Sequence, residues 1–216
     1  MAFDTNTLLS SQLHDIKNEM QALLNLQEEM AEQIVGQAGP CETLVRIQQH
    51  SASLNQQLVE LLSVLKIQNT SFSPSVDEHW LMDTLAPLCS RYKDASGLTI
   101  NCSFDDDFNQ FYDDQLLEIA LNNIMGNAKK AGANTIDISI QEFDDGGWLI
   151  KIEDNGPGFN EEQLKKGAFS LHGTKSGLGL YLIEQAIKAH KRNDKTGSIT
   201  IQNNPKQGAC VQLIFP

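Results

Sequence analysis

The sequence has 216 residues, of which 40% are hydrophobic and 20% are charged, so it can fill a packed core. At ~100–200 residues per domain, this length fits one large domain or two small ones. Sixteen Lys and Arg residues against 28 Asp and Glu residues give a net charge of −12, which argues against a general nucleic-acid or anionic-membrane binder, because phosphate groups attract basic surfaces.

The cysteines are scattered, with no CxxC pair and no histidine at metal-ligand spacing, which indicates free thiols in a reducing compartment. No apolar run approaches the ~18 residues of a membrane-spanning helix. The N-terminus also lacks the basic region and apolar stretch of a signal peptide. We therefore expect a cytoplasmic protein with no membrane segment. The four cysteines are Cys41, Cys89, Cys102 and Cys210.

Residues 1–68 are predicted to form two long helices packed as an antiparallel hairpin. Each helix has a heptad seam with one polar break, and the segment GQAGP at 36–40 separates them. Two helices cannot bury both seams, so we expect a homodimer in which two hairpins form a four-helix bundle. Packing on the rest of the chain is the alternative. The seams are Leu9, Leu13, Ile16, Met20, Leu23, Gln27, Met30 and Ile34, then Leu44, Ile47, Ser51, Leu54, Leu58, Leu61 and Leu65.

A polar segment at 69–76 indicates a linker, after which residues 77–216 alternate between helical and strand periodicity. The fold class is therefore α+β: a helical hairpin, then an α/β sandwich with helices over one face of a sheet. The predicted helices cover 77–93, 113–131 and 178–191. The predicted strands cover 98–104, 135–143, 148–154, 198–204 and 209–216, and a glycine-rich loop runs from 156 to about 177.

Four short motifs occur in order along the chain, and the first is HDIKN at 14–18. His14 follows the seam residue Leu13, which places it on the flank of the helix near water. Asp15 can hold the tautomer of a neighbouring imidazole or accept its proton, and Asn18 lies one turn further on. Taken alone, the motif also fits an ordinary polar helix face.

The second motif is NIMGNAKK at 123–130. Asn123 and Asn127 are four residues apart and share one helical face. An amide oxygen is a suitable ligand for Mg²⁺, which keeps waters and bridges phosphates, and Lys130 could pair with a phosphate. Two asparagines in an ordinary helix are the alternative.

The third motif is DNGPGF at 154–159, directly after a predicted strand. Asp154 can accept a hydrogen bond from an exocyclic amine such as that of adenine, while Gly156 and Gly158 let the backbone approach a ligand. A simple Gly-Pro turn is the alternative.

The fourth motif is GTKSGLGL at 173–180, which opens the last predicted helix. Glycines there expose backbone N–H groups at the positive end of the helix dipole, which suits phosphate. The motif matches neither a Walker loop nor a GxGxxG fingerprint, and a helix-capping loop is the alternative. Its candidate binding residues are Thr174, Lys175, Gly177, Leu178 and Gly179.

Together, the motifs resemble the catalytic core of two-component sensor histidine kinases, within the Bergerat-fold (GHKL) ATP-binding superfamily. Residues 14–18 resemble the H-box, 123–130 the N-box, and 154–158 and 177–180 the two glycine boxes. Phe169 stands where the F-box Phe of the family would lie. The resemblance covers nearly the whole chain: a dimerisation and phosphoacceptor hairpin at 1–68, the linker at 69–76 and an ATP-binding domain at 77–216.

The resemblance implies a role for each motif. His14 would be the phosphoacceptor and Asp15 its orienting base. Asn127 would ligate Mg²⁺, with Asn123 and Lys130 near the phosphates of ATP. Asp154 would recognise adenine in a pocket shaped by Gly156 and Gly158. Residues 159–176 would form a mobile lid that carries Lys175 as a phosphate contact, with Gly177 and Gly179 at its hinge.

The resemblance also separates subclasses of the superfamily. Gyrase-like and chaperone ATPases carry a Glu where Asn123 stands, to activate a water, and Asn cannot act as a base. The chain therefore looks suited to phosphoryl transfer, first to His14 and then to an aspartate on a response-regulator receiver domain. Asp15 and Asn18, as D-x-x-N, also resemble a phosphatase motif. Only 13 residues precede His14, so we expect an excised core or a stand-alone kinase informed in trans by a sensor protein.

Two other functions remain open at this point. One is a histidine phosphotransferase or scaffold whose ATP-binding-like domain binds no nucleotide, which the intact glycine boxes argue against. The other is a Ser/Thr kinase acting on an anti-sigma antagonist, which the H-box hairpin and Asn123 argue against. Outside the motifs, His190 is expected at the surface or as a cap, and Trp80 and Trp148 are expected in core and sheet packing.

Overall fold

The computed structural model divides the chain into two compact units, Met1–Lys66 and Ile67–Pro216. In the second unit it describes residues 67, 73–161, 164, 177–205 and 207–216. In the first unit it describes residues 16, 18, 20–23, 25, 26, 47, 50, 51, 54, 57, 58, 61, 63 and 65.

All described residues of the first unit are helical. The seam residues Ile16 and Leu61 are buried, whereas Met20, Leu58 and Leu65 keep exposed fractions of 51%, 40% and 43%. Part of the predicted seam is therefore left uncovered within a single chain. The connection at 36–40 lies outside the described residues, and the four-helix bundle stays a prediction.

The second unit contains a five-stranded sheet in the order β2-β4-β5-β9-β8. Strands β2 and β4 are parallel and the other neighbouring pairs are antiparallel. Ile152 of β5 pairs with Ile138 of β4 on one side and with Val211 of β9 on the other, which sets an apolar row across the sheet. The strands are β2 (Thr99–Ser103), β4 (Thr135–Glu142), β5 (Trp148–Asp154), β8 (Ser198–Asn203) and β9 (Ala209–Phe215).

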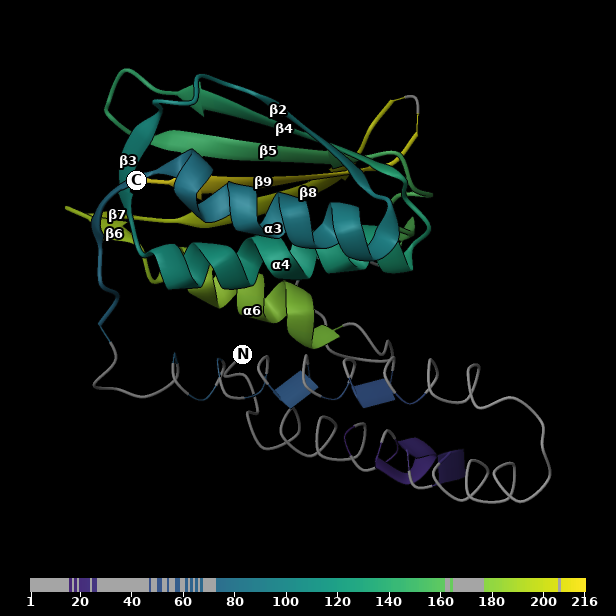
Figure 1. The fold of residues 1–216 in the computed structure, drawn as a ribbon. Helices are drawn as coiled ribbons and strands as arrows, with labels where there is room; N and C mark the ends of the chain where they lie inside the picture. Colours follow the sequence, from purple (N-terminus) through teal and green to yellow (C-terminus); the bar gives the residue numbers. More distant parts are fainter. Residues whose placement is uncertain are drawn as a thin grey trace. The chain divides into compact units, whose positions relative to one another are not determined.

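Three helices, α3 (Leu81–Ser96), α4 (Asp114–Lys130) and α6 (Gly177–Lys188), lie along one face of this sheet (Figure 1). Asp113 is the N-cap of α4, and its carboxylate accepts a hydrogen bond from Leu116 N at 2.9 Å. Such a cap satisfies one of the free N–H groups at a helix start. The predicted arrangement of helices over one face of a sheet is confirmed.

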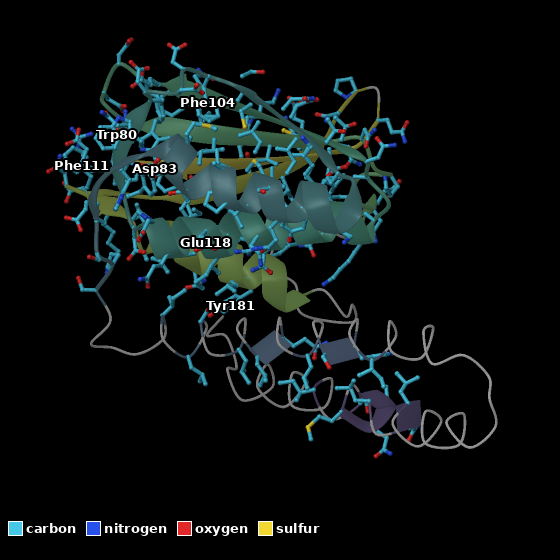
Figure 2. The ribbon with its side chains drawn as sticks, in the orientation of Figure 1. Trp80, Asp83, Phe104, Phe111, Glu118 and Tyr181 are labelled. Atoms are coloured by element: carbon cyan, nitrogen blue, oxygen red, sulfur yellow. The ribbon has the colours of Figure 1, made fainter. Side chains whose placement is uncertain are left out.

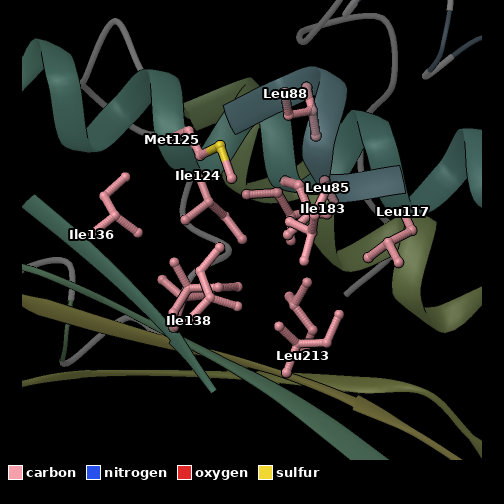
Figure 3. Close-up of a cluster of buried hydrophobic side chains, with 14 of the residues drawn as sticks. Leu85, Leu88, Leu117, Ile124, Met125, Ile136, Ile138, Ile183 and Leu213 are labelled. Atoms are coloured by element: carbon pink, nitrogen blue, oxygen red, sulfur yellow. The ribbon is translucent and has the colours of Figure 1, made fainter. Parts of the chain in front are cut away.

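The core lies between the helices and the sheet (Figure 3). Apolar side chains project from the three helices toward isoleucines and leucines of the strands, and burying each one stabilises the fold by ~1.5–3 kcal/mol. The labelled residues are Leu85, Leu88, Leu117, Ile124, Met125 and Ile183 from the helices, and Ile136, Ile138 and Leu213 from the sheet; all are at most 6% exposed.

The prediction of a helix over 77–93 is wrong at its start. Residues Asp77–Trp80 form β1, which pairs antiparallel with β3 (Asn109–Tyr112), and α3 begins only at Leu81. Leu81 N donates to Phe108 O at 3.0 Å, so contacts with a distant segment override local helical periodicity. The short strands β3, β6 (Lys191–Arg192) and β7 (Lys195–Thr196) were not predicted. No described helix is long and apolar enough to cross a membrane.

Candidate functional site

The two asparagines of the second motif lie where α4 meets α6. Asn123 is 5% exposed and its Nδ2 donates to Ile119 O at 2.9 Å. A Cβ built on Gly179 would lie 2.9 Å from Asn123 Oδ1 and 3.6 Å from Asn127 Nδ2. Only a residue without a side chain lets the first turn of α6 approach this face. The structure therefore brings the second and fourth motifs together.

Asn127 is half-buried, and within the described part of the chain nothing hydrogen-bonds to its side chain. Its amide oxygen is thus available to a ligand or a cation. Lys130 is exposed in the last turn of α4, where a cation also interacts favourably with the helix dipole.

The third motif is held against the segment that follows α4. Asn155 Oδ1 accepts hydrogen bonds from Asn134 N at 3.0 Å and from Thr135 N at 3.1 Å. A Cβ on Gly156 would lie 3.6 Å from the Cβ of Ala133. Because Ala133 comes three residues after α4, these contacts bring the third motif to the C-terminal end of the asparagine-bearing helix.

Asp154 ends β5 with a fixed carboxylate. Its Oδ1 accepts hydrogen bonds from Gly156 N at 2.8 Å and from Ala209 N at 3.2 Å. No described residue donates to its Oδ2. The half-buried carboxylate is therefore oriented by one oxygen while the other can accept a donor such as an exocyclic amine.

Several predicted site residues lie outside the described residues: His14, Asp15, Phe169, Thr174 and Lys175. Asn18 is helical and exposed. Gly177 begins α6, and Leu178 follows it, although the side chain of Leu178 is not described. The roles predicted for these residues stay predictions.

Sequence reasoning missed a support behind the second motif. The Tyr92 hydroxyl of α3 donates to Asn122 O at 2.9 Å and lies 3.1 Å from Asn122 Oδ1. A Cβ on Gly126 would come 3.2 Å from this hydroxyl. The phenol thus fixes α4 from α3, close to both site asparagines. Gly126, a small residue inside the predicted helix, was the only sign in the sequence of this close approach by Tyr92.

His190 lies at the far end of α4 and is 3% exposed. Its Nε2 accepts a hydrogen bond from Asp113 N at 2.9 Å, so Nδ1 must carry the proton, which it donates to Ala186 O at 3.0 Å. Burial lowers the pKa of this imidazole. The expectation of a capping role is met, because His190 joins the end of α6 to the N-cap of α4, but the residue is not at the surface.

The same end of the second unit carries aromatic residues. Trp148 stacks on Phe215 with ring centroids 4.3 Å apart, so its predicted place in the core is confirmed. The similar expectation for Trp80 is wrong: Trp80 is 53% exposed, and Phe111 on the partner strand is 63% exposed (Figure 2). A cavity of about 530 Å³ opens here beside Phe111, Trp148 and His190, and no residue of the four motifs lines it.

The donor set fits a magnesium-bound nucleotide. The available amide oxygen on α4 suits a cation, and the N-terminus of the 12-residue α6 suits phosphates. The carboxylate oxygen at the end of β5 suits a base. Among the described residues, no group of three His, Cys, Asp or Glu side chains could hold a metal alone. A cation would therefore share its ligands with phosphates and waters. The fold and this arrangement of residues are those expected of an ATP-binding domain of the GHKL type.

Comparison with known proteins agrees with this class. Residues 112–216 match the family described as histidine kinase-, DNA gyrase B-, and HSP90-like ATPase. The chain is 25% identical over 221 residues to the sensor protein KdpD of Escherichia coli K12, covering 98% of this chain and 24% of KdpD. It is 24% identical over 211 residues to the histidine-protein kinase/phosphatase DegS of Brevibacillus brevis, covering 96% of this chain and 50% of DegS.

Among solved structures, histidine kinase ThkA in complex with response regulator TrrA matches 97% of this chain and 61% of ThkA, with a TM-score of 0.71 and 18% identity. At that identity the match shows the fold alone. The chain spans half or less of the length of the two curated relatives. Residues 112–216 therefore carry an ATPase domain of the matched type, and over nearly its whole length the chain is similar to the catalytic cores of histidine kinases.

Proposed function

We propose that the protein is an ATP-dependent protein-histidine kinase that phosphorylates its own His14 and passes the phosphoryl group to an aspartate of a response-regulator receiver domain. The observation that carries this proposal is the meeting of three motifs around the end of α4. Gly179 lies against Asn123 and Asn127, and the Asp154 loop lies against Ala133.

The base and the phosphates of ATP would contact different elements. Asp154 Oδ2 would accept a hydrogen bond from the exocyclic amine of adenine, while Gly156 and Gly158 would line the base. Asn127 would contribute its amide oxygen to Mg²⁺, with Asn123 nearby. Lys130 and the lid residues Thr174 and Lys175 would add donors for phosphate, and the N-terminus of α6 at Gly177–Gly179 would add backbone N–H groups.

The transfer step needs chiefly position and charge neutralisation. When bound, Mg²⁺ would neutralise charge on the transferring group. A lone pair on the His14 imidazole forms the bond to the γ-phosphorus as the bond to the ADP oxygen breaks. Asp15 holds, or takes, the proton on the other ring nitrogen. Asn123 offers no base for water, which disfavours hydrolysis.

Three further parts of the proposal concern the first unit. Residues 1–68 act as the phosphoacceptor hairpin, and the exposed seam residues Met20, Leu58 and Leu65 pair with a second copy. The receiver partner is supported by the name of the ThkA complex. Asn18, helical and exposed, would position a water against a phosphorylated receiver, and the name of DegS as kinase/phosphatase supports this second activity.

Incubation with γ-labelled ATP and Mg²⁺ tests the reaction. The wild-type chain should acquire label that is lost in acid and kept in alkali, as phosphohistidine requires. His14→Gln should acquire none, while His50→Gln, a matched change in the same unit, should label as wild type. Acid-stable label, or equal label on His14→Gln, would contradict the proposal.

A further inference from the structure

The side chain of Asn203, at the end of β8, holds both backbone groups of Phe159. Its Oδ1 accepts a hydrogen bond from Phe159 N at 2.7 Å, and its Nδ2 donates to Phe159 O at 2.8 Å. The two residues are 44 positions apart in the chain. The side chain of Asn203 thus makes the two hydrogen bonds that the backbone of a neighbouring strand would otherwise make to Phe159. Phe159 ends the third motif and is also the first residue of the segment predicted as the lid.

The turn between β8 and β9 also meets the start of the third motif. Gly208 has a φ of +101°, and a Cβ there would lie 1.7 Å from the carbonyl oxygen of Asp154. Ala209 N donates to Asp154 Oδ1 at 3.2 Å. Asn204 N closes the turn by donating to Gly208 O at 2.9 Å. One end of the loop is therefore held through the Asp154 carboxylate.

The other end of the loop fits tightly against Asn203. Gly158 has a φ of +81°, and a Cβ there would lie 2.7 Å from Asn203 Oδ1. A side chain at Gly158 would therefore displace the amide from Phe159. Asn203 and Ala209 together hold the loop 154–159 from both ends, through residues that none of the four motifs contains.

We propose that Asn203 is a positioning residue for adenine binding: it holds the loop 154–159 in its binding shape before nucleotide arrives. This inference rests on the proposed function. Binding to a loop that is already ordered costs less conformational entropy. If only a fraction of the molecules has the loop in its binding shape, the apparent affinity is the intrinsic affinity multiplied by that fraction. In the described part of the chain, the side chain of Asn203 makes its hydrogen bonds only to Phe159, so its effect falls on the base end of the nucleotide and not on the phosphates.

This placement predicts a specific pattern of affinities. Asn203→Ala should weaken adenosine, ADP and ATP by the same factor, about fivefold for two exposed hydrogen bonds, with or without Mg²⁺. Asn127→Ala should instead weaken ATP with Mg²⁺ and leave adenosine unchanged. A general loss of fold stability would not separate the ligands in this way.

The experiment measures binding of the three ligands to the full chain by calorimetry, together with hydrogen exchange of the Phe159 amide without ligand. Gln202→Ala is the matched control, because Gln202 is an exposed amide on the same strand. Asn203→Asp keeps an acceptor for Phe159 N and loses the donor, so its effect should be intermediate.

Faster exchange at Phe159 and an equal loss for all three ligands in Asn203→Ala, with Gln202→Ala as wild type, support the inference. Adenosine affinity within twofold of wild type, or unchanged exchange at Phe159, overturns it. A wild-type chain that binds none of the ligands contradicts the proposed function as well, whereas normal wild-type binding with an unchanged variant contradicts this inference alone.

Discussion

His190 makes the stability of the second unit depend on pH. Its buried imidazole is held neutral between Asp113 N and Ala186 O. Burial, the largest influence, lowers its pKa below the usual 6.5, although the nearby Asp113 carboxylate acts in the opposite direction. Protonation would place a second N–H against the Asp113 N–H and remove that hydrogen bond.

The sign and size of the effect follow from proton linkage. Below pH 6.5 the unfolded chain binds a proton at this histidine that the folded chain does not, so the stabilisation is present above pH 6.5 and is lost as pH falls. The loss is at most about 1.4 kcal/mol per pH unit, so about 1.4 kcal/mol is its upper limit at roughly pH 5.5. It ends once pH falls below the folded pKa.

Urea unfolding followed by tryptophan fluorescence measures this loss for the second unit, because Trp80 and Trp148 both belong to it. His190→Gln keeps an acceptor and a donor without titrating in this range. Its free energy of unfolding should fall less than that of the wild type between about pH 7.5 and 5.5, while other titrating groups cancel in the comparison. Equal pH slopes for the two proteins would refute the reasoning.

Three other substitutions test the site. Gly208→Ala should lower Tm by roughly 5 °C or more and weaken ATP binding, because its Cβ would meet the Asp154 carbonyl oxygen at a positive φ; an unchanged Tm would contradict this contact. Gly179→Ala should weaken ATP binding about tenfold by displacing Asn123, while Tm changes little, because Ala favours the helix by ~1 kcal/mol. Tyr92→Phe should cost about 1 kcal/mol of stability in urea unfolding through the lost hydrogen bonds to α4, and a neutral effect would exclude that support.

Much of the second unit could be predicted because its signals are local. The helix α4 has an Asp at its N-cap, an apolar face and two lysines in its last turn. Strand β4 begins with alternating buried and more exposed side chains, and a DDGG turn separates it from the largely apolar start of β5. The spacing of Asn123 and Asn127 was enough to predict that they share one face of a helix. Only the structure shows that Gly179 lies against that face.

The missed features depend on contacts between distant residues. The strand β1 has four residues, and its partner β3 lies about 30 positions away, so periodicity had nothing to detect. Asn203 is one polar residue at a strand end, and His190 meets Asp113 over 77 positions. Such contacts depend on the order of the strands and on the packing of the helices, and local sequence patterns do not reveal either.

The central claim is that the second unit binds ATP at the Asp154–Asn127 end of its fold. Titration of the full chain with ATP and Mg²⁺ by calorimetry tests it most directly, with Asp154→Asn alongside. Saturable binding at one site per chain, weakened at least tenfold in Asp154→Asn, is the predicted result. No binding would contradict the claim and favour a phosphotransferase or scaffold, and binding unaffected by Asp154→Asn would contradict the assigned site.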